Sequence, residues 1–443
     1  MNAVWLKFLP QFLRDRLDGR HHLQQAMGNT GWLLADKVLR YGLGLFVGIA
    51  VARYLGPSDL GKLSYVSALV IMVASLSTIG LDDVVVQKLV RETVLTKEIL
   101  GTTFLLKLLS AILGMFILLV AVRVMRPGDE DAQMMALLMG AALLFQPIDV
   151  VDYFFQSKIQ SQYVVIARAT AFVMVSALKV GMIFVGATLI YFAGAYTVEA
   201  LIGGCLLWGS YNTCERDGLH WRWDRRLAKE LLHVSWPVAL SGTLVGFTLN
   251  IDKVLLGEFR GIHDVGLYAV ASQLSFMWNV FPVVAGASLA PLLTKMHSIN
   301  VEAYKARLQQ VYNLLTWVSV SVAALVSFFA QDITILLFGS KYSGAGDILA
   351  VNVWSTVFIF HVSMRSRAFL IEGRQKYIAI FAGGTLLANI LLNLALIPLY
   401  GAIGSAFASV LCWLICAGVL SLLWPDTRPS AYMFFSSFIP RVK

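Results

Sequence analysis

The chain has 443 residues, of which 58% are hydrophobic and 14% are charged, and its mean hydropathy is +0.73. A soluble domain carries about 25% charged residues, so this composition excludes an ordinary soluble globular protein. The net charge of +9 gives no argument for nucleic-acid binding, because the excess of basic residues lies in the loops on one side of a predicted membrane protein.

The first segment, residues 1–30, predicts a helix that lies on the cytoplasmic leaflet. Its apolar positions recur at helical spacing between Trp5 and Leu17, with arginines between and beyond them. It has no uninterrupted apolar stretch followed by a small-residue cleavage site, as a cleavable signal peptide would have. A basic amphipathic helix of this kind is typical of the membrane interface.

Apolar stretches of about 20 residues then recur from Trp32 to Trp424, each long enough to cross a hydrocarbon core about 30 Å thick. Strands of a membrane barrel need only about 10 alternating residues, so these lengths predict helices. The sequence therefore predicts an all-α polytopic membrane protein with about twelve transmembrane helices. The predicted spans lie near 31–54, 60–81, 100–124, 133–156, 162–186, 188–210, 234–257, 264–293, 309–330, 346–371, 377–397 and 402–424.

The distribution of Lys and Arg predicts the orientation. If the N-terminus is inside, 23 of these residues lie in or beside the cytoplasmic segments and 7 lie on the opposite side. This is a strong positive-inside bias, and an even number of spans agrees with it. Both termini are therefore expected to be cytoplasmic.

A short motif occurs twice, each time where one apolar helix ends and the next begins. Gly261-Ile-His-Asp264-Val-Gly266 lies 205 positions after Gly56-Pro-Ser-Asp59-Leu-Gly61. Parallel repeats are an expected transporter design, in which substrate is handled between the halves. We therefore expect a cytoplasmic interfacial segment, an N-terminal six-helix bundle, a cytoplasmic basic linker, a C-terminal six-helix bundle and a cytoplasmic tail. Their predicted bounds are 1–30, 31–210, 211–233, 234–424 and 425–443.

Three charged residues interrupt the first span. Asp36, Lys37 and Arg40 lie among apolar residues, with Arg40 about 13 Å past the predicted helix start near Gly31. Charges at this depth are costly and usually face a wet cavity or a partner. One interpretation is an Asp36–Arg40 pair with Lys37 extending towards the interface. The other is that Lys37 or Arg40 lines an anion-binding cavity.

Further charges within the spans favour the second interpretation. Lys107, Arg168 and Lys179 lie in spans three and five, and Arg365 lies at the inner end of span ten. We predict more intramembrane cations than acids, which indicates an anionic ligand or deeply solvated surfaces. Arginine suits phosphate because its planar fork donates bidentate hydrogen bonds. The acids and amides within the spans that accompany these cations are Asp36, Asp149, Asp152, Asn250, Asp252, Asn389 and Asn393.

Two sets of these polar residues each have two possible interpretations. Asp252, beside Lys253 and Asn250 near the outer end of span seven, suits either a gate or a simple interfacial pair. Asn389 and Asn393 share a helix face in span eleven, where they suit either helix packing or substrate contact.

Enzyme signatures are absent from the sequence. It contains no HExxH, no GxSxG and no cluster of His and Cys at metal-ligand spacing. The segment from Gly56 to Lys62 resembles a phosphate loop, but Leu63 stands where that motif needs Ser or Thr to hold magnesium. We therefore predict no enzyme activity, no catalytic residue, no cofactor and no metal site.

Five stretches of the sequence occur in this order: VARYLGPSDLGKLSYVSAL, STIGLDDVVVQKLVRE, AKELLHVSWPVALSGTLVGFTLNIDKVLLGEFRGIHDVGLYAVASQL, ILLFGSKYSGAGDILAV and NILLNLALIPLYGAIGSAFAS. Together they resemble the polysaccharide-transporter proteins of the multidrug/oligosaccharidyl-lipid/polysaccharide exporter superfamily, and the similarity runs from about Met27 to Trp424. The resemblance implies two pseudo-symmetric six-helix bundles around a central cavity.

It also implies a flippase of the Wzx type in the bacterial inner membrane. Such a protein moves undecaprenyl-pyrophosphate-linked oligosaccharide repeat units from the cytoplasmic to the periplasmic leaflet, for the synthesis of lipopolysaccharide O-antigen, capsule or exopolysaccharide. The expected partners are the lipid-linked oligosaccharide, membrane lipids and a polysaccharide polymerase, with no nucleic acid. Alternating access would expose the head group on each side in turn.

With this substrate, the predicted cations become head-group contacts and the other polar groups orient them or carry a coupling ion. The candidate substrate-binding residues are Lys37, Arg40, Arg168, Lys179 and Arg365. The candidate orienting or ion-coupling residues are Asp36, Asp149, Asp152, Asn250 and Asp252.

Three alternatives stay open. A lipid II flippase of the same superfamily would handle a related substrate but usually has two additional spans, which the sequence does not show. A cation-coupled drug antiporter would favour acidic cavity residues. A membrane polymerase or ligase acting on lipid-linked sugars usually needs a large periplasmic loop, whereas the predicted outer loops are short.

Overall fold

A computed structural model describes residues 21–215 and 221–439 of the chain. The described residues form helices and turns and contain no β-strand, so the prediction of an all-α fold is confirmed. The predicted interfacial helix falls mainly on residues 1–20, which lie outside the described residues. The same holds for 216–220 of the predicted linker and for 440–443 of the tail.

Ten helical segments in the described part of the chain are long and apolar enough to cross a membrane, which confirms a multi-pass membrane protein. Two of them, Ala35–Arg91 and Lys376–Leu422, are 57 and 47 residues long. A single crossing needs only about 20 residues. The first segment contains two glycines with a non-helical backbone, Gly56 and Gly80, and the second contains one, Gly401. A count of twelve spans in two bundles stays a prediction.

The described chain divides into two compact units. The first consists of the described part of Met1–Gly48 together with Ser77–Ala239, and the second of Ile49–Leu76 together with Leu240–Lys443 as far as it is described. The helix α2 (His21–Ser77) is therefore divided between the units. Its residues up to Gly48 belong to the first unit, and Ile49–Leu76 belong to the second unit. The division at 210 and 234 that the sequence predicts stays a prediction.

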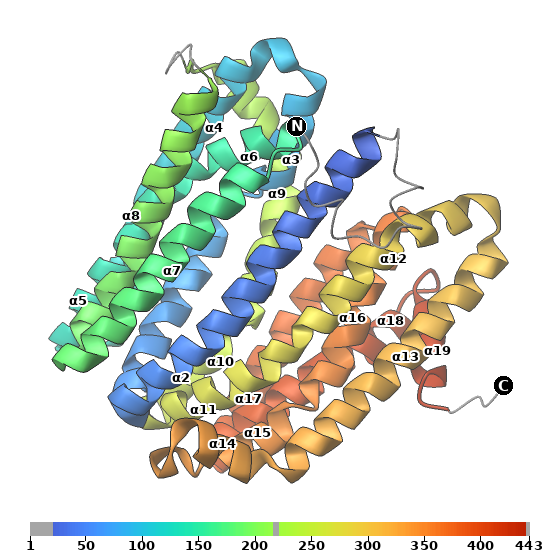
Figure 1. Cartoon of the computed structure of the whole chain (residues 1–443). Helices are drawn as coiled ribbons and strands as arrows, with labels where there is room; N and C mark the ends of the chain where they lie inside the picture. The colour runs from blue at the N-terminus through green and yellow to red at the C-terminus, as the bar shows by residue number, and fades with distance from the viewer. Residues whose placement is uncertain (1–20, 216–220, 440–443) are drawn as a thin grey trace. The chain divides into compact units, whose positions relative to one another are not determined.

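In the first unit, α5, α7 and α8 lie side by side (Figure 1). A 3-10 segment, Ala141–Asp149, follows α5 and contains Pro147, which cannot donate a backbone hydrogen bond and so interrupts the α-helical pattern. The helices after α2 are α3 (Leu81–Arg91), α4 (Thr96–Met125), α5 (Glu130–Gly140), α6 (Val150–Ser157), α7 (Gln162–Val185), α8 (Leu189–Cys214) and the first part of α9 (Arg225–Thr248).

In the second unit, α17 packs against α10, α15 and α16, and α13 packs against α16. A π-helical segment, Ile415–Val419, follows α17 and leaves carbonyl groups out of the α-helical ladder. The helices are α10 (Ile251–Phe259), α11 (Ile262–Phe276), α12 (Val280–Ile299), α13 (Val301–Phe328), α14 (Ala330–Phe338), α15 (Ala345–Asn352), α16 (Ser355–Ile371), α17 (Lys376–Leu414), α18 (Leu420–Leu422) and α19 (Arg428–Ser436).

The described end of the basic–aromatic linker joins the core of the first unit. The ring of Trp221 lies 5.4 Å from that of Phe104 and 5.4 Å from that of Trp208, measured between centroids. Its indole N–H donates a hydrogen bond of 3.2 Å to the hydroxyl of Tyr211. The neighbouring Arg222 is exposed, so the aromatic half of this motif packs inward while the charge stays outside.

Candidate functional site

A cavity of about 380 Å³ lies within the first unit, between α2, the 3-10 segment, α7 and α8. Four charged residues line it, two of each sign: Arg40, Asp149, Arg168 and Glu199. Small residues on α7 and α8, including Gly203, leave room for the space. A partly open cavity with charged residues in its lining, inside an apolar helical unit, is a place where a charged ligand group can bind.

Arg40 reaches this cavity from the first part of α2. Its Nε donates to Asp36 one turn earlier, with a distance of 3.0 Å to Oδ1, and its Nη1 lies 3.6 Å from Oε1 of Glu199 on α8. The guanidinium also stacks over the ring of Phe172, 5.1 Å from the centroid. The predicted Asp36–Arg40 pair is therefore present, and Arg40 also lines a cavity, so the two interpretations of this residue are compatible.

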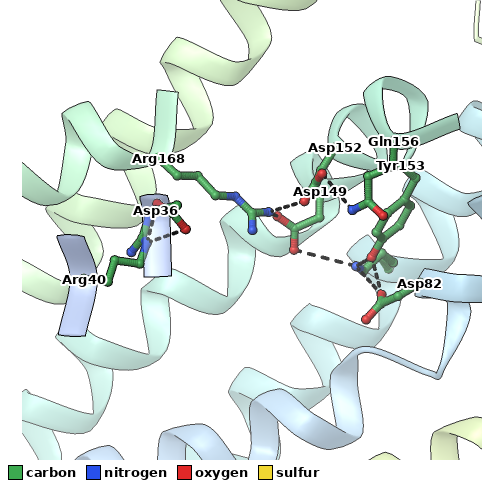
Figure 2. Close-up of polar contacts among 9 residues, drawn as sticks. Asp36, Arg40, Asp82, Asp149, Asp152, Tyr153, Gln156 and Arg168 are labelled. Carbon is green, nitrogen blue, oxygen red and sulfur yellow. Dashed lines mark hydrogen bonds and ion pairs between the residues drawn. The ribbon is translucent and has the colours of Figure 1, made fainter. Parts of the chain in front are cut away.

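Arg168 reaches the same cavity from α7 and holds two carboxylates with one nitrogen. Its Nη2 lies 2.9 Å from Oδ1 of Asp149, at the end of the 3-10 segment, and 3.0 Å from Oδ2 of Asp152 on α6 (Figure 2). The other oxygen of Asp152 accepts a hydrogen bond of 2.9 Å from the amide of Gln156. The structure thus brings together three residues that the sequence predicted separately.

Behind Asp149 lies a buried lysine. The side chain of Lys107, on α4, is 1% exposed. Its ammonium nitrogen lies 3.8 Å from Oδ2 of Asp149 and 3.4 Å from Oδ1 of Asp82 on α3. It also donates to the hydroxyl of Tyr153. That hydroxyl in turn donates to Asp82 (Figure 2). Asp149 therefore bridges two cations, with one oxygen towards Arg168 and the other towards Lys107.

Acids outnumber bases in the two ion-pair clusters around Arg40 and Arg168, taken together. Asp82 and Glu199 were missing from the sequence-based candidates, and they bring the number of carboxylates to five against three cations. Glu199 had a usable signal, because it is a lone acid near the middle of the predicted span 188–210. Asp82 had none, because it lies just after a predicted span, where acids are ordinary.

The other predicted cations of the first unit lie beside the cavity or away from it. Lys179, on α7, is half-buried, and its ammonium lies 4.9 Å from the ring centroid of Tyr196, which lines the cavity. Lys37 is exposed, and within the described part of the chain its side chain has no hydrogen-bond or ion-pair partner. Of the candidates in this unit, Arg40 and Arg168 therefore have the strongest structural support.

Arg365 lies in the second unit, where its guanidinium is bound to the protein itself. It is 3% exposed and donates to the carbonyl of Cys416 in the π-helical segment and to Oγ of Ser421, the latter at 2.8 Å. The ring centroid of Phe381 lies 4.6 Å from the guanidinium carbon. These contacts occupy the arginine with neutral groups of α17 and the segment after it, so the geometry supports a structural role.

Asp252, on α10, is the centre of a buried polar network in the same unit. Its carboxylate accepts hydrogen bonds of 2.7 Å from Tyr268, 2.7 Å from Ser409 and 2.9 Å from the amide of Asn393. The amide of Asn393 also donates to Asn389, so the two asparagines of span eleven belong to the same hydrogen-bond network. Asn250 precedes α10 and donates to the carbonyl of Gly246 at 3.0 Å.

Comparison with known proteins adds a family match and a fold. The sequence model of a family described as polysaccharide biosynthesis protein matches residues 26–297, more than half of the chain. A relative from Haloferax volcanii named "Probable flippase AglR" is 26% identical over 174 residues, which cover 36% of this chain and 34% of that protein. The chain thus spans about a third of the length of this curated relative.

Two solved structures have a similar fold. An inward-facing multidrug resistance MATE family transporter of the MOP superfamily has a TM-score of 0.73 at 15% identity, covering 89% of this chain and 95% of that one. The lipid II flippase MurJ, in an inward closed conformation, has a TM-score of 0.71 at 15% identity, covering 92% and 91%. These likenesses confirm an all-α fold of the kind that these two transporters have, while the two six-helix bundles around a central cavity stay a prediction.

Proposed function

Because the chain belongs to the polysaccharide biosynthesis protein family, we propose that it is a flippase for lipid-linked oligosaccharides. The observation that carries the proposal is the cavity of the first unit, which presents two arginines inside an apolar helical body. The name of the Haloferax relative and the fold shared with a lipid II flippase support the same function. It also agrees with the resemblance of the sequence to polysaccharide transporters.

The chemistry of such a substrate divides it into two parts. The polyprenyl tail is as apolar as the bilayer and stays in lipid, so only the pyrophosphate and the sugars need a polar path. Arg40 and Arg168 lie on different helices and line one cavity, so their planar forks are placed to donate to the oxygens of one head group. Lys179, behind Tyr196, adds positive charge on the same side.

The carboxylates around the arginines have a defined part in this proposal. Without substrate, Asp36, Asp149 and Asp152 neutralise the two guanidinium groups and hold them in place. A phosphate that binds Arg168 replaces Asp149 and Asp152 as its partner, so these acids need another source of positive charge. Lys107 supplies it for Asp149, because its ammonium stays beside the second oxygen. Asp152 then becomes the group that takes up a coupling proton.

The second unit supplies a separate candidate for coupling. Asp252 is a buried carboxylate whose hydrogen-bond donors are neutral, from Tyr268, Ser409 and Asn393. A carboxylate in such a place favours a proton or a small cation as its companion. We therefore retain Asp252 and the adjacent Asn250 as ion-coupling candidates and assign Arg365 to the fold.

The remaining details follow the sequence predictions. The carrier is undecaprenyl pyrophosphate, the protein lies in a bacterial inner membrane with both termini cytoplasmic, and the head group moves from the cytoplasmic to the periplasmic leaflet. The positive-inside bias of 23 to 7 supports this orientation. A polysaccharide polymerase would use the product on the outer side.

One observation favours a second function. The two ion-pair clusters beside the cavity together have five carboxylates and three cations, and an excess of acids suits a cation-coupled small-molecule antiporter such as the MATE transporters whose fold it shares. The arginines argue against this alternative, because a cationic drug gains nothing from contact with them.

Deletion of the gene tests the choice between the two functions. Lipid-linked glycans extracted from the membrane are sorted by leaflet with a sugar-modifying probe added to the outer side. The flippase account predicts that one lipid-linked oligosaccharide accumulates on the cytoplasmic side and that the wild-type gene reverses it. Intact surface polysaccharide with no accumulation, together with a changed sensitivity to drugs, would favour the antiporter.

A further inference from the structure

The cavity of the first unit continues along α8 beyond the two arginines. The α8 residues in its lining share one helix face, and they are Tyr196, Glu199, Ala200, Gly203, Gly204 and Leu207. Arg168 lines the same cavity from α7, and Lys179, which contacts the ring of Tyr196, follows Arg168 by 11 positions. This spacing corresponds to about 16 Å along the helix axis, which is longer than a pyrophosphate group. The end of the cavity at Tyr196 therefore has room for another part of a substrate.

Glu199 is held more loosely than Asp149, the other acid of the lining. Among the described residues its only ion pair is with Arg40, at 3.6 Å between Oε1 and Nη1, which is too long for a hydrogen bond. Arg40 has a closer carboxylate partner in Asp36, at 3.0 Å, and Asp149 lies 2.9 Å from Arg168. The side chain of Glu199 is 27% exposed. Its oxygens can therefore accept hydrogen bonds from a ligand.

Tyr196, one turn before Glu199, adds an aromatic surface. Its side chain is 38% exposed, and the ammonium of Lys179 lies 4.9 Å from the ring centroid. Within the described part of the chain its hydroxyl forms no hydrogen bond. The ring offers an apolar face and the hydroxyl a polar edge, while the neighbouring carboxylate accepts hydrogen bonds. A sugar has the matching pattern, with apolar C–H faces and hydroxyl groups around the edge of its ring.

We propose that Tyr196 and Glu199 form a saccharide subsite, which binds the sugar next to the pyrophosphate. The proposal rests on the proposed flippase function and on the predicted orientation. In that orientation α7 runs from the inner to the outer side, so Arg168, six residues after its start, lies near the leaflet from which the lipid enters. Tyr196 then lies deeper, and the order of the two ends matches the order of pyrophosphate and sugar in the substrate.

The charge of Glu199 separates the two parts of the head group. A carboxylate repels phosphate, which therefore stays with Arg40 and Arg168, whereas a neutral sugar can approach it. Hydrogen bonds from sugar hydroxyls to a carboxylate are charge-assisted and roughly twice as strong as bonds between neutral groups. A sugar without free hydroxyls at this place leaves the carboxylate without donors. Glu199 is thus a specificity-determining residue, in addition to its contact with Arg40.

Binding of probes that differ only in the sugar tests the subsite. The purified full chain is titrated with farnesyl pyrophosphate and with farnesyl pyrophosphates that carry one hexose or one N-acetylhexosamine. The wild type should bind the better sugar-bearing probe about tenfold more tightly than the bare pyrophosphate. Glu199→Gln should lower this ratio of affinities by about tenfold, because it weakens the bonds to the sugar and relieves the repulsion of phosphate. Glu302→Gln, at a glutamate that is 82% exposed on α13, is the control and should keep the ratio.

Tyr196→Leu gives a second measurement if Glu199→Gln does not fold, since it changes no charge. It should weaken binding of the sugar-bearing probe roughly fivefold and leave that of farnesyl pyrophosphate unchanged. Tyr191→Leu is the matched control, because Tyr191 is exposed on the same helix and lies outside the cavity lining.

The outcomes separate the subsite from the flippase assignment. An equal loss of affinity for both kinds of probe would mean that Glu199 and Tyr196 only position Arg40, and it would overturn the subsite. A wild type without preference for a sugar would overturn it as well, while the flippase assignment would stand. A wild type that binds none of the probes would overturn the flippase assignment, on which the subsite depends.

Discussion

In the first unit the guanidinium groups of Arg40 and Arg168 meet carboxylates beside a cavity, whereas in the second unit that of Arg365 meets carbonyls, a hydroxyl and aromatic rings. All three are arginines inside apolar spans, and the sequence alone gave no reason to separate them. The difference lies in their surroundings. A charge that is paired beside open space can exchange its partner for a ligand, whereas a buried guanidinium whose terminal nitrogens donate to neutral groups of the protein is held by the fold.

The largest effect on stability is expected at Arg365. Replacement of Arg365 by methionine leaves the carbonyl of Cys416 and the hydroxyl of Ser421 without their donor in a buried place. Unpaired buried groups cost about 1–3 kcal/mol each, so the free energy of unfolding should fall by roughly 3 kcal/mol. The midpoint of thermal unfolding in detergent measures this loss. Arg307→Met, at an exposed arginine, is the control; an equal midpoint for both variants would contradict the structural role of Arg365.

A smaller loss of stability, with a change in transport, is expected at Lys107. Lys107→Met removes the buried cation between Asp82 and Asp149, at a cost of about 1.5–3 kcal/mol. It should also raise the substrate concentration needed for half-maximal transport, because Asp149 then competes with substrate for Arg168. Lys107→Arg keeps the positive charge, so it should return the half-maximal substrate concentration nearly to the wild-type value. Its thermal stability should recover less completely. If the methionine variant loses stability alone, Lys107 does not position Asp149 for binding.

Asp252→Asn should affect coupling more than stability. The amide keeps the shape of the side chain and one acceptor oxygen within the network of Tyr268, Ser409 and Asn393, so the cost should be about 1 kcal/mol. Transport driven by an imposed proton or sodium gradient should lose its dependence on the gradient, while exchange without a gradient continues. A variant that still follows the gradient would remove Asp252 from the coupling candidates.

The smallest effect is expected at Lys37. This lysine is exposed and lies one turn from Tyr41 on the same helix as Arg40, but it is absent from the cavity lining. Lys37→Ala should therefore leave both the thermal midpoint and the transport rate close to those of the wild type. A loss of transport as large as that of an Arg40 variant would show that the cavity extends to Lys37 during the cycle.

The sequence predicted the fold class and the contacts that helical spacing determines. The apolar stretches gave the helices, and the spacing of Asp36 and Arg40 gave their ion pair. The resemblance to polysaccharide transporters gave the superfamily fold. The 205-residue repeat gave two copies of a motif, whose first glycines share one backbone conformation and whose following helix starts touch each other.

Contacts between helices could not be predicted from the sequence, because they depend on how each helix is rotated about its own axis. Arg168 of α7 pairs with Asp149 at the end of the 3-10 segment and with Asp152 on α6, and the sequence does not show that these elements face each other. The burial of Arg365 depends on carbonyls freed by a π-helical segment that has no sequence signature. The depth of a charged residue within a span follows from its position in the sequence. The direction in which its side chain points does not.

Binding of the head group is the central claim, and a proteoliposome assay with a fluorescent pyrophosphate-linked saccharide tests it most directly. Arg40→Ala and Arg168→Ala each remove a charge-assisted donor worth about 1.5–3 kcal/mol, which corresponds to roughly a 10- to 100-fold loss of affinity. The account predicts a loss of this size for each variant, with Arg307→Ala at the wild-type value and equal amounts of protein in the membrane. Unchanged binding and transport in both cavity variants would contradict it.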